Sequence, residues 1–533
     1  MNLFFEKIIN NLNKPKSWLI LVNVALVLFL IIFNNLGIIP LRIGDFVFFA
    51  ILTLFLALYR PGWAFLFFVG TIALENINLA PLELGIAIRP YQFIGALTIT
   101  AIIIRLLSGK LNFKLVKLEW YDWLIVIINI GGLFSIINAS NKILSLKLAI
   151  ILATFSALYF LVRNYIQNIE DLKKVVPFFL SSSLVVVFYG IWQNIWFLRG
   201  LNSFETMPGR PNATFSEADW LGIFIVLVIS LIYVLIYYFE DSDRSLASGA
   251  PEAKLLLGGL FLLLTISYVL LILTVSRSAW LGAFAVTFIF LFTIFTNLKF
   301  HPKNWQWRET IKIKLIIVPA LFVAVGLVYI FHLTNFQLFN RVQSTGSGMQ
   351  KITVSCNVGN ANLRSLPKEI ENISELEKYS CRHINLEEIE IEKNQGNLVT
   401  EIFRKDPNIS IRSFIYQRSW QEIKNHPILG IGWGSIGKIL GEDGRGMNFN
   451  SSNIFLEIWL GSGILGFASF VIMLSYILGR AIKEYYAAQN DSQIIISLFL
   501  IISWFAIIVP NFFNAGIFLG FFWLWLGIAQ IKK

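Results

Sequence analysis

The sequence predicts an all-α, polytopic membrane protein: a bundle of about 12–14 transmembrane helices with one large extracytoplasmic loop. Of its 533 residues, 56% are hydrophobic and only 14% are charged, which is more apolar surface than a soluble core could bury. Apolar runs of the roughly 17–25 residues needed to cross a bilayer recur from end to end. Lys and Arg gather in alternate connections between these runs, as is typical of membrane proteins.

Each predicted span is an apolar run bounded by charged residues, Gly or Pro. The third run is short and the last two are separated only by Pro510-Asn511, so twelve or thirteen spans remain possible. Residues 1–333 would form a membrane domain with about eleven spans, and residues 453–533 would add two or three. The candidate runs are 17–33, 44–59, 62–75, 91–107, 121–137, 145–162, 175–198, 218–239, 255–273, 278–297, 314–333, 453–479, 493–510 and 513–530.

The distribution of Lys and Arg predicts the orientation, because positive charge stays in the cytoplasm during insertion. With the amino terminus inside, the cytoplasmic segments hold twenty-two of these residues and the short outer segments hold seven. The long loop at 334–452 is then extracytoplasmic, and periplasmic in a cell with two membranes. Because this asymmetry accounts for most of the net charge of +11, nucleic acid is not an expected partner.

The long loop divides by composition. Residues 350–400 are polar and rich in Glu, and they read as an insert. The only two cysteines, Cys356 and Cys381, fall in this insert, where oxidising conditions favour a disulfide over two free thiols. No Cys/His set has metal-ligand spacing, so neither a metal nor another cofactor is expected. Residues 410–426 predict an amphipathic helix, capped by Ser410 and ended by His426-Pro427.

Four short motifs carry the functional information. Asn453 is followed, after nine residues, by Gly463-Ile464-Leu465-Gly466. An Arg-rich stretch ending in Trp420 precedes Pro427-Ile-Leu-Gly-Ile-Gly-Trp-Gly434. Two earlier motifs are Pro208-Gly-Arg-Pro-Asn-Ala-Thr-Phe215 and Thr274-Val-Ser-Arg-Ser-Ala279. Together they resemble the bacterial O-antigen ligase and polymerase superfamily. One position departs from the family pattern, because Ser452 occupies the place of the histidine that usually precedes the asparagine.

The resemblance implies a GT-C-like membrane fold in the bacterial inner (plasma) membrane. It also implies transfer of a glycan from an undecaprenyl-diphosphate-linked donor to a glycan, lipid or protein acceptor. The leaving diphosphate needs cationic partners, and arginine binds phosphate oxygens through a planar fork. The candidates are Arg210, Arg277, Arg412 and Arg418. The alternative for each is an interfacial arginine that extends to the lipid headgroups.

The group that activates the acceptor is less clear, because serine cannot replace an imidazole as a base near neutral pH. Glu217 lies close to Arg210 in sequence, and Glu457 lies one helical turn beyond Asn453. We therefore take Glu217, Glu457, Ser452 and Asn453 as candidate catalytic residues, with ordinary interfacial carboxylates as the alternative. The loss of the histidine favours a polymerase over a ligase. The alternative function is a transporter, since some proteins with a similar domain are regarded as bicarbonate or inorganic-carbon transporters.

Overall fold

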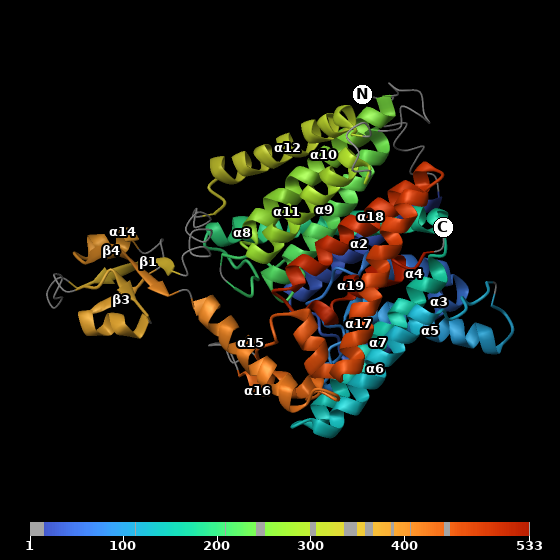
Figure 1. Cartoon of the computed structure of the whole chain (residues 1–533), viewed down its shortest axis with the longest axis horizontal. Coiled ribbons are helices and arrows are strands. Elements are labelled where there is room, and N and C mark those ends of the chain that lie inside the picture. The colour runs from blue at the N-terminus through green and yellow to red at the C-terminus, as the bar shows by residue number, and fades with distance from the viewer. Residues whose placement is uncertain are drawn as a thin grey trace. The chain divides into compact units, whose positions relative to one another are not determined.

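The computed structural model of the chain divides into two compact units, which are described separately: residues 1–328 with 422–533, and residues 329–421. Figure 1 shows the helices of the first unit packed side by side. The structure describes residues 15–111, 113–207, 209–240, 251–298, 305–334, 349–357, 366–371, 373–384, 389–405, 407–441 and 448–531.

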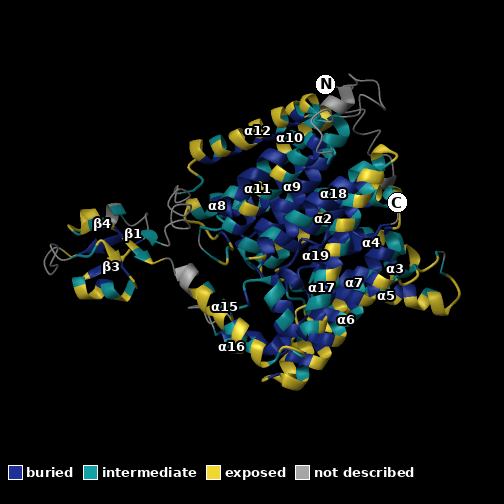
Figure 2. Ribbon diagram, viewed as in Figure 1, coloured by how far each residue is buried: buried dark blue, intermediate teal, exposed yellow. Residues whose placement is uncertain are grey.

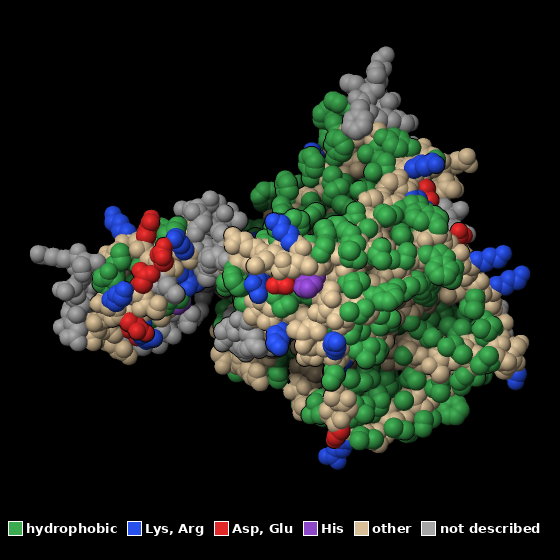
Figure 3. Space-filling view, turned by 60° about the horizontal axis from the view of Figure 1, so that its bottom comes forward, with side chains coloured by type: hydrophobic (Ala, Val, Ile, Leu, Met, Phe, Trp, Pro, Cys, Tyr) green, Lys and Arg blue, Asp and Glu red, His purple; other side chains and the backbone are tan. Residues whose placement is uncertain are grey.

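The first unit is a helical bundle, which confirms the predicted fold class. Among the described residues, eleven helices are long and apolar enough to cross a membrane. Because apolar side chains such as Phe48, Phe55 and Phe322 are exposed on this unit, its surface suits lipid. Figure 3 shows hydrophobic side chains over most of its visible face. The long helices are α2 Pro15–Asn35, α5 Pro90–Leu107, α6 Trp120–Phe134 with its 3-10 continuation to Asn138, α7 Lys142–Tyr165, α8 Ile169–Leu198, α9 Ala218–Glu240, α10 Pro251–Leu273, α11 Arg277–Thr296, α12 Trp307–Ile330, α17 Ile454–Ala487 and α18 Asp491–Asn511.

Two apolar runs form shorter helices than the sequence predicts, α4 Pro61–Gly70 and α19 Gly520–Ile528, whereas the run expected at 44–59 forms α3 Ile43–Tyr59 as predicted. The run expected at 513–530 is interrupted because Asn511 accepts the Gly516 N–H and Asn514 donates to the Pro510 carbonyl, which folds residues 512–519 into a turn. All nine residues of α19 are buried, as Figure 2 shows for the centre of this unit.

Residues 71–81, the first part of the irregular segment that follows α4, are mostly buried and therefore need hydrogen-bond partners. The Asn76 N–H donates to the Thr214 carbonyl, and the Thr214 hydroxyl donates to the Ala73 carbonyl. Glu75 accepts from the backbone N–H of Gly520 and pairs with Arg89 at 3.0 Å. These contacts fix the segment against the start of α19 and the connection between α8 and α9.

The second unit contains a β-sheet that the sequence analysis did not predict. Its strands β1 Met349–Cys356, β2 Glu369–Ile370, β3 Cys381–His383 and β4 Leu398–Lys405 pair in the order β2-β4-β1-β3. Alternation along 350–356 places Ile352 and Val354 in a small core with Ile402. The Glu-rich insert also contains the short helix α14 Ile389–Asn394. Charged side chains of both signs are scattered over this unit (Figure 3).

The predicted amphipathic helix is present as α15 Pro407–Asn425. It begins three residues before the predicted cap, so Ser410 lies inside the helix. The reason is that proline suits the first turn of a helix, where its missing N–H has no partner to lose. The expected end at His426-Pro427 is confirmed to within one residue.

The predicted disulfide between Cys356 and Cys381 is present and joins β1 to β3. Replacing both cysteines by serine should lower the stability of the second unit by about 3 kcal/mol at most, because the bridge restricts a loop of 25 residues in the unfolded chain. Urea unfolding followed by protease sensitivity of this unit measures the change. Glycan transfer should persist in the double variant. Two free thiols in protein from native membranes would contradict the assignment.

Candidate functional site

Three of the four sequence motifs meet at one end of the bundle, here called the motif end. It consists of the α8–α9 connection (199–217), the α10–α11 turn (274–276), the start of α17 with residues 448–453, and the α18–α19 connection (512–519). Arg210 Nε donates to the Thr274 carbonyl at 3.0 Å. Asn514 Nδ2 donates to Ser278 Oγ at 2.9 Å, and Asn453 Nδ2 donates to the Phe512 carbonyl at 3.1 Å. These bonds join segments separated by up to 236 residues.

Arg210 is held on two sides. Besides its bond to Thr274, its guanidinium forms an ion pair with Asp219 at 3.3 Å, and its side chain is only 16% exposed. Its backbone closes a tight turn, in which the Arg210 N–H donates to the Met207 carbonyl. A guanidinium fixed in this way presents a positive charge in a defined place, with little side-chain entropy left to lose on binding an anion.

Arg277 is the first residue of α11, and Ser276 caps this helix by accepting the Ala279 N–H. The amino-terminal end of a helix attracts anions through its unpaired N–H groups and the helix dipole. Gly222 of α9 allows close approach here, because a Cβ at this position would lie 2.6 Å from the Ala279 side chain. The turn that carries Arg277 is therefore packed tightly against α9.

Each of the three motifs contains one non-glycine residue with left-handed backbone. The φ angles are +46° at Ala213, +51° at Val275 and +50° at Ser452. This conformation is unusual for any L-residue and is an outlier for a β-branched one such as valine. Such strain concentrates at functional sites, where the surrounding structure enforces a particular geometry.

The candidate residues on α17 have clear structural partners. Asn453 caps the helix by accepting the N–H groups of Phe455 and Leu456. Glu457 is buried, and its carboxylate accepts the Ser451 N–H at 2.8 Å, so it closes the turn that precedes the helix. Ser452 donates its N–H to the Asn450 side chain. The motif thus builds a rigid turn at the motif end.

The glycines of the late motifs allow two chain segments to meet backbone to backbone. The Ile431 N–H donates to the Leu460 carbonyl and the Ile464 N–H to the Ile428 carbonyl. Gly463 has a φ of +66° and interrupts α17, and a Cβ there would lie 2.0 Å from the Ile428 oxygen. Gly430 approaches the Leu460 oxygen in the same way. Gly463 and Gly430 are therefore required for the docking of residues 428–431 against α17.

Residues 259–471 match the protein family described as O-antigen ligase. This match supports the resemblance of the motifs to the O-antigen ligase and polymerase superfamily. The matched region begins in α10 and ends in α17, so it includes Arg277, the second unit and the Asn453 motif, whereas Arg210 precedes it. No curated protein and no solved structure matches the chain. The match and the eleven long apolar helices of the described residues together indicate a multi-pass membrane protein.

Three further candidate site residues, two arginines and one glutamate, lie on α15 and just before α9. Arg412 and Arg418 lie on α15 in the second unit, where Arg418 donates to Gln421 at 3.3 Å. Glu217 immediately precedes α9, and its backbone carbonyl accepts the Leu221 N–H. Their roles in glycan transfer are predictions.

One acidic residue at the motif end was missed by the sequence analysis. Glu205 lies in the α8–α9 connection and accepts the Gly209 N–H on one carboxylate oxygen at 2.9 Å. Its other oxygen, Oε1, is buried and has no hydrogen-bond partner among the described residues. An unsatisfied buried acceptor costs about 1–3 kcal/mol. Burial raises the pKa of Glu205 to about 7, although the Gly209 N–H and the Ser203 hydroxyl act in the opposite direction.

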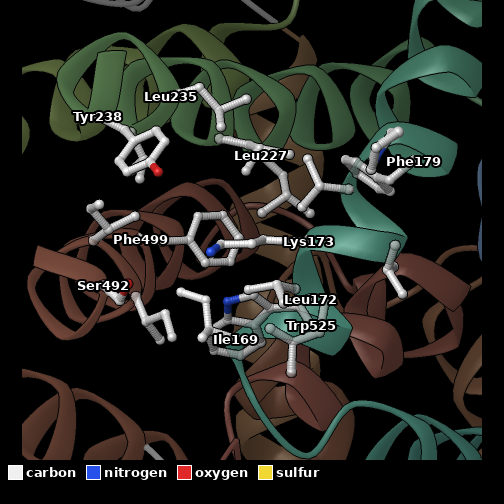
Figure 4. A pocket seen from close by; sticks show the side chains of 18 of the residues that line it. Ile169, Leu172, Lys173, Phe179, Leu227, Leu235, Tyr238, Ser492, Phe499 and Trp525 are labelled. Carbon is white, nitrogen blue, oxygen red and sulfur yellow. The ribbon is translucent and has the colours of Figure 1, made fainter. Parts of the chain in front are cut away.

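A separate apolar pocket lies far from these residues. It has a volume of about 370 Å³ and is formed by α8, α9, α18 and α19, with Lys173, Tyr238 and Phe499 among its lining residues (Figure 4). Tyr238 is nineteen residues along α9 from Asp219, which corresponds to about 28 Å at the helical rise of 1.5 Å per residue. This pocket therefore opens near the other end of the bundle and cannot contain the groups held by Arg210.

Proposed function

We propose that this protein is a membrane glycosyltransferase that moves a glycan from an undecaprenyl-diphosphate-linked donor to an acceptor hydroxyl on the outer face of the bacterial inner membrane. The observation that carries the proposal is the bond from Arg210 to Thr274, three residues before Arg277. It joins two arginine motifs that are distant in sequence. The motif end would then face outward, with the amino terminus in the cytoplasm, as the Lys and Arg asymmetry favours.

The chemistry explains why two arginines are needed. When the sugar leaves its carrier, the bond between the anomeric carbon and the phosphate oxygen breaks and the diphosphate gains negative charge. Fixed cationic groups around a developing anion lower the barrier by about 3–4 kcal/mol each. Arg210 and Arg277 would bind the diphosphate, aided by the amino terminus of α11. Arg412 and Arg418 are further candidates from the second unit.

The turn that holds Ser452 favours a polymerase over a ligase acting on a lipid or protein. Ser452 cannot supply the imidazole base expected of a ligase. Asn453 and Glu457 hold the turn in place, so we assign them a positioning role. Glu217 remains a candidate for contact with the acceptor. The other substrates and partners are membrane lipids and the acceptor glycan.

Transport is less well supported. Secondary transporters place ionisable groups near the middle of the bilayer. Here the described buried ion pairs lie near helix ends: Glu75 with Arg89, which precedes α5, and Asp122 with Arg163, near the start of α6 and the end of α7.

Glycan profiles of a deletion strain test the proposed function. Accumulation of carrier-linked single repeats indicates a polymerase. Carrier-linked polymer with a bare acceptor lipid indicates a ligase. Expression of the intact gene should restore the original profile. An unchanged glycan profile in the deletion strain would contradict both the polymerase and the ligase assignment. Uptake of bicarbonate, measured in parallel, should stay at the wild-type level.

A further inference from the structure

A polar pocket lies beside Glu205 at the motif end. Its volume is about 250 Å³, which is enough for a sugar ring. It is formed by the end of α2, the irregular segment after α4, and α8 with the α8–α9 connection that follows it. The polar side chains that line it are Asn34, Asn35, Asn76, Tyr189, Thr214 and Glu205.

The lining has the character of a carbohydrate site. Each asparagine offers both donors and acceptors, as sugar hydroxyls require, and a tyrosine adds an aromatic face with a polar tip. A cation site is not indicated, because no group of three or more His, Cys, Asp or Glu side chains suited to a metal occurs in the described part of the chain. The pocket has one carboxylate, Glu205, whose oxygen Oε2 accepts the Gly209 N–H and whose oxygen Oε1 has no hydrogen-bond partner among the described residues.

We propose that this pocket binds the acceptor sugar and that Glu205 is the general base for the attacking hydroxyl. This proposal depends on the proposed function and names its missing base. The hydroxyl proton passes to the Glu205 carboxylate as the hydroxyl oxygen bonds to the anomeric carbon of the donor. The bond from that carbon to the diphosphate breaks, and its electron pair leaves with the diphosphate.

The loop geometry connects the base to the phosphate site. Glu205 and Arg210 belong to one turn, in which the Gly209 N–H holds the carboxylate and the next residue is the arginine. Ala213 lines the pocket and has left-handed backbone. A change of its backbone conformation would therefore move the whole loop. Gln193 of α8 fixes this point by accepting the Ala213 N–H at 2.7 Å.

The pH dependence follows from the groups that face Glu205. The side chains from α2 and the segment after α4 are neutral amides, and Thr214 is a neutral hydroxyl. Tyr189 of α8 is the other titratable lining residue, and its hydroxyl donates to Asn35 at 3.0 Å. Since a base must be deprotonated and the pKa of Glu205 is raised to about 7, transfer should increase with pH through about 7 and level off above it.

The test uses the full-length protein in nanodiscs. The carrier-linked repeat from the deletion strain serves as donor, and the same repeat freed of its carrier serves as acceptor. Glu205→Gln should lower kcat for transfer about a hundredfold and remove the rise in rate near pH 7, whereas donor affinity should stay unchanged. The control is Glu83→Gln, at an exposed acid in the segment after α4, which should behave as wild type. Wild-type kcat in Glu205→Gln, or an intact pH limb, would overturn the role of Glu205.

A second measurement separates this proposal from the proposed function. Binding of the carrier-free repeat alone, measured by titration calorimetry, should weaken about tenfold in Asn34→Ala, which removes a lining amide. Equal affinity in wild type and Asn34→Ala would overturn the pocket assignment. Binding that depends on Asn34, in a protein that transfers no glycan from any undecaprenyl-diphosphate donor, would support the sugar pocket and reject the transferase together with its base.

Discussion

Arg210→Lys and Arg277→Lys should each lower the rate of glycan transfer about a hundredfold while the protein still inserts and accumulates. A lysine keeps the positive charge but loses the planar fork that binds two phosphate oxygens at once, which corresponds to about 3 kcal/mol of lost stabilisation. For Arg210 the change also removes the Nε–H that donates to Thr274. Transfer rates at matched protein levels measure the effect.

The alternative role, attachment to lipid headgroups, needs only a long stem with a positive tip, so it predicts near-wild-type rates for both lysine variants. Arg199→Lys is the matched control, because Arg199 is an exposed arginine in the same α8–α9 connection. This variant should be silent. Full activity of both Arg210→Lys and Arg277→Lys would refute diphosphate binding at these positions.

Gly463→Ala should have the largest effect on folding. Left-handed backbone costs a non-glycine residue about 1–2 kcal/mol, and the added methyl would overlap the Ile428 carbonyl oxygen at 2.0 Å. The docked segment must then move away from α17, which breaks the bond between Ile464 and Ile428. We expect a loss of several kcal/mol in total and little monodisperse protein after extraction in detergent.

The same helix provides the control. Gly479 has no atom within 4 Å of an added Cβ, and alanine is favoured over glycine inside a helix by about 1 kcal/mol. Gly479→Ala should therefore keep or raise the thermal midpoint measured by size-exclusion chromatography after heating. Equal midpoints for Gly463→Ala and wild type would show that the glycine is not needed for docking.

The positions of the long helices could be predicted from the sequence because the cause is local. A run such as 218–239 is apolar throughout, and a bilayer imposes both its length and its helical form. The disulfide could also be predicted, because Cys356 has only Cys381 as a partner. The family resemblance depended on short motifs, and the match over 259–471 confirmed it.

The sheet of the second unit could not be predicted with the same ease. Its strands are short, and β2 has only two residues that pair with β4. Alternation over so few residues is a weak signal, and pairing between distant strands decides the outcome. The turn at 512–519 was missed for a related reason, since Asn511 and Asn514 interrupt an otherwise apolar run by bonding to the backbone.

The sequence by itself determined that this chain is a polytopic membrane protein whose arginine-bearing motifs resemble the superfamily, because composition and spacing are properties of neighbouring residues. Only the tertiary structure decided which motifs meet, and it showed Glu457 bonded to the Ser451 backbone. It also placed Glu205 in a pocket formed by α2, α8 and the segment after α4. The side chain of Glu205 is enclosed by segments that are far apart in the chain, so no local sequence pattern marked this residue.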